Sequence, residues 1–487
     1  MKIKALGGIA LLALMSACAT GSQAGLPAAG EEGRPLAFPG AEGFGRFTTG
    51  GRGGRVIKVT NLNDAGEGSL RAALEASGPR IVVFDVDGTI PLTTDIIVRN
   101  GDLTIAGQSA PGGGITLRDH AIQINADNVI ARYIRARMGD EAGAESDAFS
   151  LGAGENIIID HVSASWANDE TLSVTQRYVP GGEIRHLTNV TVQWSIISEA
   201  LNNAGHEKGE HGYGSLIQGS FGAKYSFHHN LWAHHQARMP RIGNYAAATE
   251  DPEGVIYDFR NNVFYNWGDG ATTDFYNWQT GLDRGYNMDP FYGRPDNQSR
   301  CAAGANLNSN SVTRANLVNN AYIQGANTCA PLTMYLRNRG AAVHLSGNTM
   351  DGVVMPDQNA SVISSMGEGW KRDEPFEFAG VRTQTAAEAF EAVLAGAGAS
   401  KWRDPVDARV VQTVRDRSGR IINSQADVGG WPELPRGEVQ PDGDGDGMPD
   451  SWERVNGLNP ADAADGPADR DGDGITHVED YLNSLVS

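Results

Sequence analysis

The chain has 487 residues, of which 40% are hydrophobic and 20% charged. That much apolar material can close a sizeable core, which excludes a disordered chain, and the glycines follow no period of three, which excludes collagen. The formal net charge of -20 argues against a nucleic-acid-binding surface. Residues 441–487 contain ten Asp, two Glu and two Arg, so half of the net charge lies in this short segment. Such a density predicts bound cations or a solvated tail.

The first residues have the pattern of an export signal. Lys2 and Lys4 precede an apolar run that is too short to span a bilayer and ends in Met-Ser-Ala-Cys, at Cys18. This ending is similar to a lipobox, which predicts a lipoprotein signal over residues 1–18, a lipid on the cysteine, and a tether over residues 19–36. We therefore expect a cell-envelope lipoprotein on the outer membrane or cell surface. Cleavage beside the cysteine, followed by simple secretion, is the alternative.

Two further cysteines, Cys301 and Cys329, lie 28 positions apart in a stretch rich in Gly and Asn. In an exported protein such a pair is more often bonded than free, which predicts a disulfide that staples a loop. No Cys/His spacing typical of zinc occurs. No later run reaches the ~18 apolar residues of a transmembrane helix, so the lipid is the only membrane contact that we expect.

Between about residues 80 and 350, short β-runs alternate with Gly, Asn and Asp, and helical periodicity is nearly absent. Runs that start at Leu103, Val129, Ile157, Val190 and Tyr225 are spaced 26, 28, 33 and 35 residues apart, and Asn precedes the middle three. This irregular repeat is typical of a solenoid in which each turn stacks on the last. Hairpin signals are rare. The sequence therefore predicts an all-β, right-handed parallel β-helix.

Both ends of such a stack need covering. Residues 69–76 have helical spacing with Ser as the N-cap, and we expect this helix to plug the first turn. A second helix is predicted over residues 386–394, and residues 400–440 are expected to wrap the far end. The β-helix domain, including this C-terminal wrap, is therefore placed at residues 37–440.

Three motifs occur in a fixed order along this domain. They are Phe38-Pro39-Gly40-Ala41-Glu42-Gly43-Phe44-Gly45, Asp160-His161 at a strand end, and His228-His229-Asn230-Leu231 followed by Arg238-Met239-Pro240-Arg241. Together they resemble the pectate lyase family (polysaccharide lyase family one), over about residues 37–350 and on toward 440. The resemblance implies β-elimination in polygalacturonate, in which a base removes the C5 proton and the glycosidic oxygen leaves from C4. It also implies Ca²⁺ with oxygen ligands, which neutralises the uronate carboxylate.

The resemblance assigns roles to the basic residues. Arg238 corresponds to the general base, although arginine ordinarily stays protonated. Arg241 corresponds to a fork that binds a substrate carboxylate with two hydrogen bonds. Lys208 is a candidate for a substrate-binding lysine. The alternative for each of the three is an ion-paired or solvated charge.

The ligands of the catalytic Ca²⁺ are expected on the turns next to this arginine. Glu145 and Asp147 lie two apart, hence on one face of a strand, and correspond to the family's acidic pair. One turn later the family has two acidic ligands four apart. Alternation aligns them with Asp169 and Ser173, so the second carboxylate is missing here. Glu170 can substitute if the strand is bulged or shifted by one residue.

The acidic tail carries two copies of the 12-residue calcium loop. The first copy consists of Asp442, Asp444, Asp446, Met448, Asp450 and Glu453, and the second of Asp469, Asp471, Asp473, Ile475 and Asp480. The last Asp stands where the loop has a bidentate Glu. A short helix is predicted after each loop, at 452–454 and 478–485. The pair resembles the calcium-stabilised repeats of exported enzymes and implies structural Ca²⁺ over residues 441–487; a disordered tail is the alternative.

Other readings of the sequence remain open. His228, His229, His234 and His235 are expected to be stacked side chains with satisfied hydrogen bonds rather than metal ligands. A polygalacturonase-like hydrolase shares the β-helix but needs clustered Asp carboxylates, and its motifs are not found. A pectin lyase needs no Ca²⁺ carboxylates, and a non-catalytic surface protein would bind pectin through Ca²⁺. We expect a monomeric lyase whose partner is polygalacturonate, with no nucleic acid.

Overall fold

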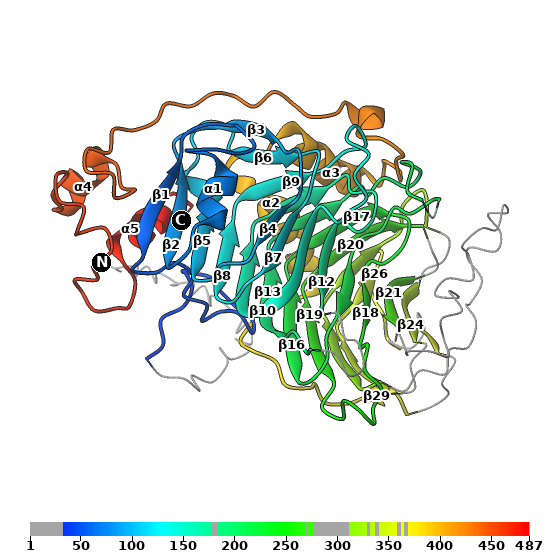
Figure 1. Ribbon diagram of the computed structural model, residues 1–487. Coiled ribbons are helices and arrows are strands. Elements are labelled where there is room, and N and C mark those ends of the chain that lie inside the picture. The colour runs from blue at the N-terminus through cyan, green and yellow to red at the C-terminus, as the bar shows by residue number, and fades with distance from the viewer. Residues whose placement is uncertain are drawn as a thin grey trace, which may run out of the picture.

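The computed structural model describes a coil of parallel strands that form three sheets, named A, B and C here (Figure 1). The described residues are 33–176, 183–207, 209–268, 271–276, 311–328, 332–336, 340–357, 362–364 and 369–486. The coil is the right-handed parallel β-helix that the sequence predicts, and right-handed is the sense that crossovers between parallel strands adopt.

Each sheet takes one strand from successive turns of the coil. Sheet A consists of β1 (Arg55–Val59), β2 (Arg80–Phe84), β5 (Leu103–Ala106), β8 (Val129–Arg132), β10 (Phe149–Asp160), β13 (Leu187–Gln193), β16 (Ala223–His228), β19 (Val255–Arg260), β22 (Thr313–Val318), β25 (Ala341–Ser346) and β29 (Lys371–Arg372). Sheet B consists of β3 (Gly88–Pro91), β6 (Ile115–Arg118), β9 (Ile134–Arg137), β11 (Ser163–Ser165), β14 (Ile196–Ser198), β17 (Leu231–His235), β20 (Val263–Trp267), β23 (Ala321–Ile323), β26 (Thr349–Met350) and the antiparallel β27 (Val353–Val354). Sheet C consists of β4 (Ile96–Val98), β7 (Ile122–Asn125), the first part of β10, β12 (Leu172–Thr175), β15 (Leu216–Gln218), β18 (Arg241–Gly243), β21 (Ala271–Tyr276), β24 (Leu332–Leu336) and β28 (Val362–Ser364).

The helices lie outside the coil, except that the first one packs Leu70, Ala73 and Leu74 into its core. They are α1 (Leu70–Glu75), α2 (Ala386–Gly396), α3 (Pro405–Asp416), α4 (Asp450–Asn456) and α5 (His477–Ser484), with short 3-10 turns η1 (Gly107–Ser109), η2 (Ser400–Trp402) and η3 (Gln425–Val428). The helices predicted after the N-cap Ser69, in the 386–394 segment and after each acidic loop are thereby confirmed.

The predicted repeat is also the register of sheet A. Leu103 pairs with Val129, which pairs with Ile157, and the series continues through Val190 to Tyr225. The five strand starts read from the sequence therefore stack directly on one another. Each strand of this series alternates between side chains that face the core and side chains that face outward.

The asparagine before a strand has a conformational reason. Asn128, Asn156 and Asn189 have φ values of 58°, 59° and 51°, in the left-handed region. Asn tolerates this region better than most residues, and it lets the chain turn sharply from one sheet into the next. A second asparagine series is buried inside a turn. Asn230, Asn262, Asn320 and Asn348 are linked by side-chain hydrogen bonds of 3.0–3.1 Å.

The C-terminal wrap takes a different course from the predicted one. Helices α2 and α3 cover the outer face of sheet B, where Val393 and Val410 pack against Leu231 and Val263. The chain then runs back toward the first turns, and Arg436 contacts Asp87 there. The expectation that residues 400–440 cover the far end is therefore wrong. Apolar side chains on sheet B, many turns earlier in the chain, determine this course.

A buried ionic network fixes the wrap to sheet B. The guanidinium of Arg137 donates to both oxygens of Asp404 (2.9 and 3.0 Å) and to Asp407 (2.9 Å), and Ser163 donates to Asp407 (2.6 Å). All four side chains are at most 1% exposed. The two carboxylates lie at the start of α3, where Asp404 is also the N-cap. Removing one partner would leave a buried charge without compensation.

We therefore expect Asp404→Ala to lower the free energy of unfolding by about 3–5 kcal/mol. Urea denaturation followed by circular dichroism measures this change. Asp416→Ala is the matched control, because this aspartate lies at the exposed end of the same helix, and we expect it to change stability by less than about 0.5 kcal/mol. Equal effects of the two substitutions would show that the network does not fix the wrap.

Candidate active site

Three carboxylates from neighbouring turns meet beside sheet C. Asp147 precedes β10, and Asp169 and Glu170 precede β12, which pairs with β10 in parallel. Parallel strands in register bring the residues before them to the same edge of the sheet. Carboxylate oxygens of the three residues lie within 4.8 Å of one another. The structure thus brings together three of the acidic residues that the sequence singled out.

Arg238 joins this carboxylate cluster from the turn before β18. Its guanidinium forms an ion pair with Glu170, and its carbon lies 4.1 Å from the ring centre of Tyr213. The side chains of Arg238 and Glu170 are only 7% and 4% exposed. Backbone bridges from Glu170 to Tyr213 and from Tyr213 to Ala237 align the three segments. The arginine is therefore held at the edge of the acidic group and partly shielded from water.

Two histidines support the cluster from the loop after β14. His211 Nε2 lies 2.7 Å from Asp169, and its ring stacks on that of His206 at 4.0 Å. Burial opposes ionisation of Asp169, but the hydrogen bond with His211 and the charge of Arg238 outweigh it and lower the pKa of Asp169 to about 2. The carboxylate is thus charged at neutral pH, as a ligand for a hard cation must be.

The strand alternation used to align Ser173 does not extend to Asp169 and Glu170. Leu172 and Val174 face the core, so Ser173 faces outward, where its hydroxyl accepts a hydrogen bond from the Leu216 N–H (3.2 Å). Asp169 and Glu170 precede the regular strand. Their carboxylates lie in the same cluster, although adjacent residues of a regular strand would point to opposite faces. Among these residues it is therefore Glu170, and not Ser173, whose carboxylate lies with those of Asp147 and Asp169.

The remaining predicted site residues surround this cluster at different places. Glu145 accepts a hydrogen bond from the backbone of Glu207 (2.7 Å) and lies 3.9 Å from His206. Arg241 starts β18 and is 2% exposed, on the outward side because the next residue, Ile242, is in the core. Lys208 lies outside the described residues. Tyr213 and His211, which follow Lys208 closely in the chain, were not predicted as site residues.

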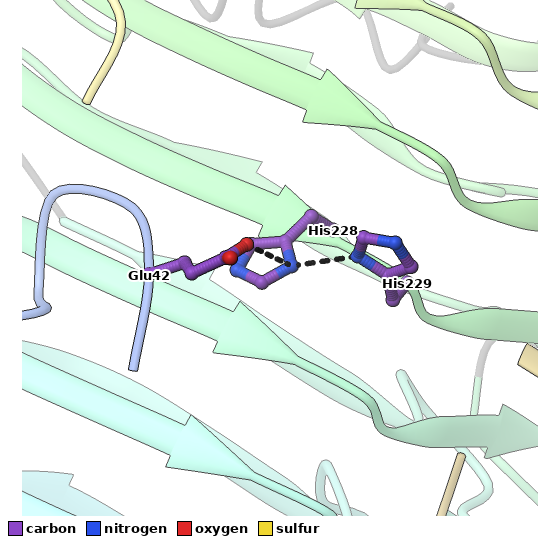
Figure 2. A group of neighbouring side chains, drawn as sticks. All are labelled: Glu42, His228 and His229. Carbon is purple, nitrogen blue, oxygen red and sulfur yellow. Dashed lines mark hydrogen bonds and ion pairs between the residues drawn. The ribbon is translucent and has the colours of Figure 1, made fainter. Parts of the chain in front are cut away.

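A second group of polar residues lies on sheet A, away from the cluster. Figure 2 shows Glu42, from the loop before β1, beside His228 and His229 at the end of β16. The Nδ1 atoms of the two imidazoles are 3.0 Å apart, and His229 also hydrogen bonds to Gln384 (2.9 Å). Burial lowers the pKa of His229 to about 4 and that of His228 well below its ordinary value, so both rings are neutral at neutral pH.

Three of the four histidines have the satisfied hydrogen bonds that the sequence predicts, whereas Nε2 of His228 is buried and has no hydrogen-bond partner among the described residues. His229 stacks on Trp194 (4.3 Å, 13°), while His234 hydrogen bonds to Thr413 (2.8 Å) and His235 to the carbonyl of Ile197 (3.0 Å). Glu42 accepts a hydrogen bond from the backbone of Arg382 (3.0 Å). These contacts tie the N-terminal segment and the C-terminal wrap to the β-helix, which is a structural function.

The two acidic loops of the tail share one backbone path. In the first, Asp442 accepts hydrogen bonds from the N–H groups of Gly445 and Gly447 (2.7 and 2.9 Å). In the second, Asp469 accepts the equivalent bonds from Gly472 and Gly474 (2.8 and 2.9 Å). A helix, α4 or α5, follows each loop. Both segments thus have the turn that a calcium loop needs at its central glycine.

Comparison with known proteins gives consistent relatives. No protein-family profile matches the chain. A probable pectate lyase C from Aspergillus flavus is 36% identical over 460 residues, which cover 93% of this chain and 94% of the relative. A probable pectate lyase C from Aspergillus terreus is 34% identical over 491 residues, 98% of each chain. Among solved structures, a pectate lyase from Bacillus sp. N165 in complex with trigalacturonate is 16% identical, with a TM-score of 0.44, over 73% of this chain and 98% of that one.

This chain is a parallel β-helix, and its sequence matches these pectate lyases along nearly its whole length. It is therefore a polysaccharide lyase. The chain belongs to the pectate lyase family.

Proposed function

We propose that this protein cleaves polygalacturonate by Ca²⁺-dependent β-elimination, with Arg238 as the general base. The observation that carries the proposal is the cluster of Asp147, Asp169 and Glu170 directly beside that arginine. All three offer carboxylate oxygens, which are the ligands that Ca²⁺ prefers, and a low pKa keeps Asp169 charged. The residues present therefore fit the cation that the family implies.

The bound cation would neutralise the uronate carboxylate and thereby make the C5 proton more acidic. Arg238, acting as the base, accepts this proton from C5. The C–H electron pair becomes the C4=C5 double bond, the C4–O bond breaks, and the glycosidic oxygen leaves with its electron pair and takes a proton from water. The products are a new reducing end and a 4,5-unsaturated uronate.

Glu170 links the two parts of the site. It is the ion-pair partner of Arg238 and also a member of the carboxylate cluster. An ion pair favours the protonated guanidinium, which cannot accept a proton. When Glu170 serves as a metal ligand, this ion pair is weakened, and the arginine is closer to the neutral form that a base requires. Ultraviolet absorbance tests the proposal, because only elimination forms a double bond conjugated with the carboxylate.

We assign Arg241 to binding of a substrate carboxylate. We expect Arg241→Lys to raise KM by about tenfold with a smaller effect on kcat, because an ammonium cannot make the two parallel hydrogen bonds of a guanidinium. Steady-state kinetics on polygalacturonate measure both constants. Arg260→Lys is the matched control, since this arginine is likewise buried but lies on sheet A, where it is paired with Asp258. A fall in kcat with unchanged KM for Arg241→Lys would contradict the assignment.

We further propose that the two tail loops bind structural Ca²⁺ and that the chain is exported, with lipid on Cys18. The lipidation site and the cysteines Cys301 and Cys329, which we propose to be disulfide-bonded, lie outside the described residues. Within the described part of the chain, no helix is both long and apolar enough to cross a membrane.

A further inference from the structure

Three carboxylates of the tail are buried together. Asp446 and Glu453 belong to the first calcium loop, and Asp465 belongs to the linker between the two loops. Their side chains are buried, with residue exposures of 5%, 0% and 3%, and their oxygens lie within 4.8 Å of one another. Sequence spacing identifies the first two as loop positions five and twelve. It does not point to Asp465, which lies outside both 12-residue loops.

Several oxygens of this group accept no hydrogen bond from the described residues. They are both carboxylate oxygens of Glu453, one of Asp446 and one of Asp465. The other oxygens of the two aspartates accept N–H groups, from Met448 (2.9 Å) and Asn459 (3.0 Å), which fixes the carboxylates in place. Buried carboxylates without partners are strongly unfavourable unless a cation is bound among them. A set of carboxylate oxygens is suited to Ca²⁺.

We propose that one Ca²⁺ is held by Asp446, Glu453 and Asp465, and that it fastens the linker and the second loop to the first loop. This inference rests on the proposal that the first loop binds Ca²⁺, and it adds the linker ligand and its consequence. The backbone carbonyl of Asp465 is 2.8 Å from His477 Nδ1, at the start of α5. A ligand at this position therefore connects the ion to the helix of the second loop.

The fastened tail covers part of the β-helix. Val82 and Phe84 of β2 face the core, whereas Ile81 and Val83 face outward and are 0% and 3% exposed. The side chains that bury them, with Ala106, come from the tail: Met448, Val478 and Leu482. Figure 1 shows α5 beside β1 and β2, with α4 farther from these strands. Ca²⁺ binding in the tail is therefore coupled to the stability of the first turns.

Two ion pairs strengthen this docking. Lys58 of β1 lies 2.6 Å from Asp442 in the first loop. Arg52 contacts both oxygens of Glu479 in α5 (2.9 and 3.0 Å). Each pair joins one calcium loop, or the helix after it, to the N-terminal end of the coil. If the loops lost their shape, both pairs and the apolar contacts would be lost together.

The experiment is a Ca²⁺ titration of the full-length protein, after chelator treatment, followed by hydrogen exchange of tail and β2 peptides. In wild type, Ca²⁺ should slow hydrogen exchange in both the tail peptides and the β2 peptides. Asp465→Asn should raise the Ca²⁺ concentration for half-maximal protection by about tenfold or more. Removing a ligand weakens metal affinity at least as much as removing a residue that hydrogen bonds to a ligand. Asp462→Asn is the control, since this linker aspartate is exposed. Protection that returns for Asp465→Asn at high Ca²⁺ confirms a weakened site and excludes a misfolded variant.

Equal Ca²⁺ dependence of Asp465→Asn and Asp462→Asn would overturn the linker ligand while leaving the loop proposal standing. Protection of the tail without protection of β2 would overturn the coupling to the first turns. A wild-type tail with no response to Ca²⁺ would overturn both the loop proposal and this inference. Lyase activity is a separate readout, because the carboxylate cluster beside Arg238 is not part of the tail.

Discussion

Replacing Arg238 by alanine is expected to lower kcat on polygalacturonate by about 10²- to 10⁴-fold, which is the usual contribution of a general base. The guanidinium lies at the edge of the cluster formed by Asp147, Asp169 and Glu170. An alanine side chain has no group that could accept the C5 proton. Kinetics at saturating substrate and Ca²⁺ measure the change.

Alanine also leaves Glu170 without its ion-pair partner, so a second variant is needed. Arg238→Lys keeps a positive charge beside Glu170 but not the shape of the guanidinium. We expect it to be nearly as inactive as the alanine variant, with a melting temperature closer to that of wild type. Arg415→Ala, on the exposed surface of α3, is the control for general effects. More than a tenth of wild-type kcat in Arg238→Ala would exclude this residue as the base.

Glu170→Gln is expected to raise the Ca²⁺ concentration for half-maximal activity by about tenfold or more, because an amide oxygen is a weaker ligand than a carboxylate. Ser173→Ala is the informative partner, since its hydroxyl already accepts a hydrogen bond from the Leu216 N–H. We expect this variant to stay within about twofold of wild type. A Ca²⁺ titration of lyase activity separates the two.

A larger shift for Ser173→Ala than for Glu170→Gln would contradict the ligand set proposed from the structure. It would instead support the alignment that alternation gives, in which the second ligand lies on β12. The plateau at saturating Ca²⁺ provides a further check. Loss of the ion pair with Arg238 changes kcat, whereas a weakened cation site changes the concentration needed to reach the plateau.

The turns of the β-helix could be predicted from the sequence because their signals are local. A β-run preceded by asparagine marks a strand that starts from a left-handed residue, as at Asn128, Asn156 and Asn189. The spacing between such runs then gives the register of sheet A. The helix that starts after Ser69 could be predicted for the same reason, because its N-cap side chain and its apolar spacing are both local signals.

Long-range packing could not be predicted in the same way. The course of the wrap depends on Asp404 meeting Arg137, 267 positions earlier in the chain. The place of Glu170 depends on where the regular strand begins, since alternation holds only inside β12. The burial of Asp465 depends on how the linker folds back on the first loop. None of these contacts leaves a periodic pattern in the residues that make it.

The most direct test follows ultraviolet absorbance while the purified protein acts on polygalacturonate, with Ca²⁺ and with a chelator, and assays reducing ends in parallel. The predicted result is a rise in both signals with Ca²⁺ and in neither with the chelator, because elimination forms one conjugated double bond for each new reducing end. New reducing ends without absorbance would identify a hydrolase and contradict elimination. Retention of the polymer with neither signal would identify a binding protein.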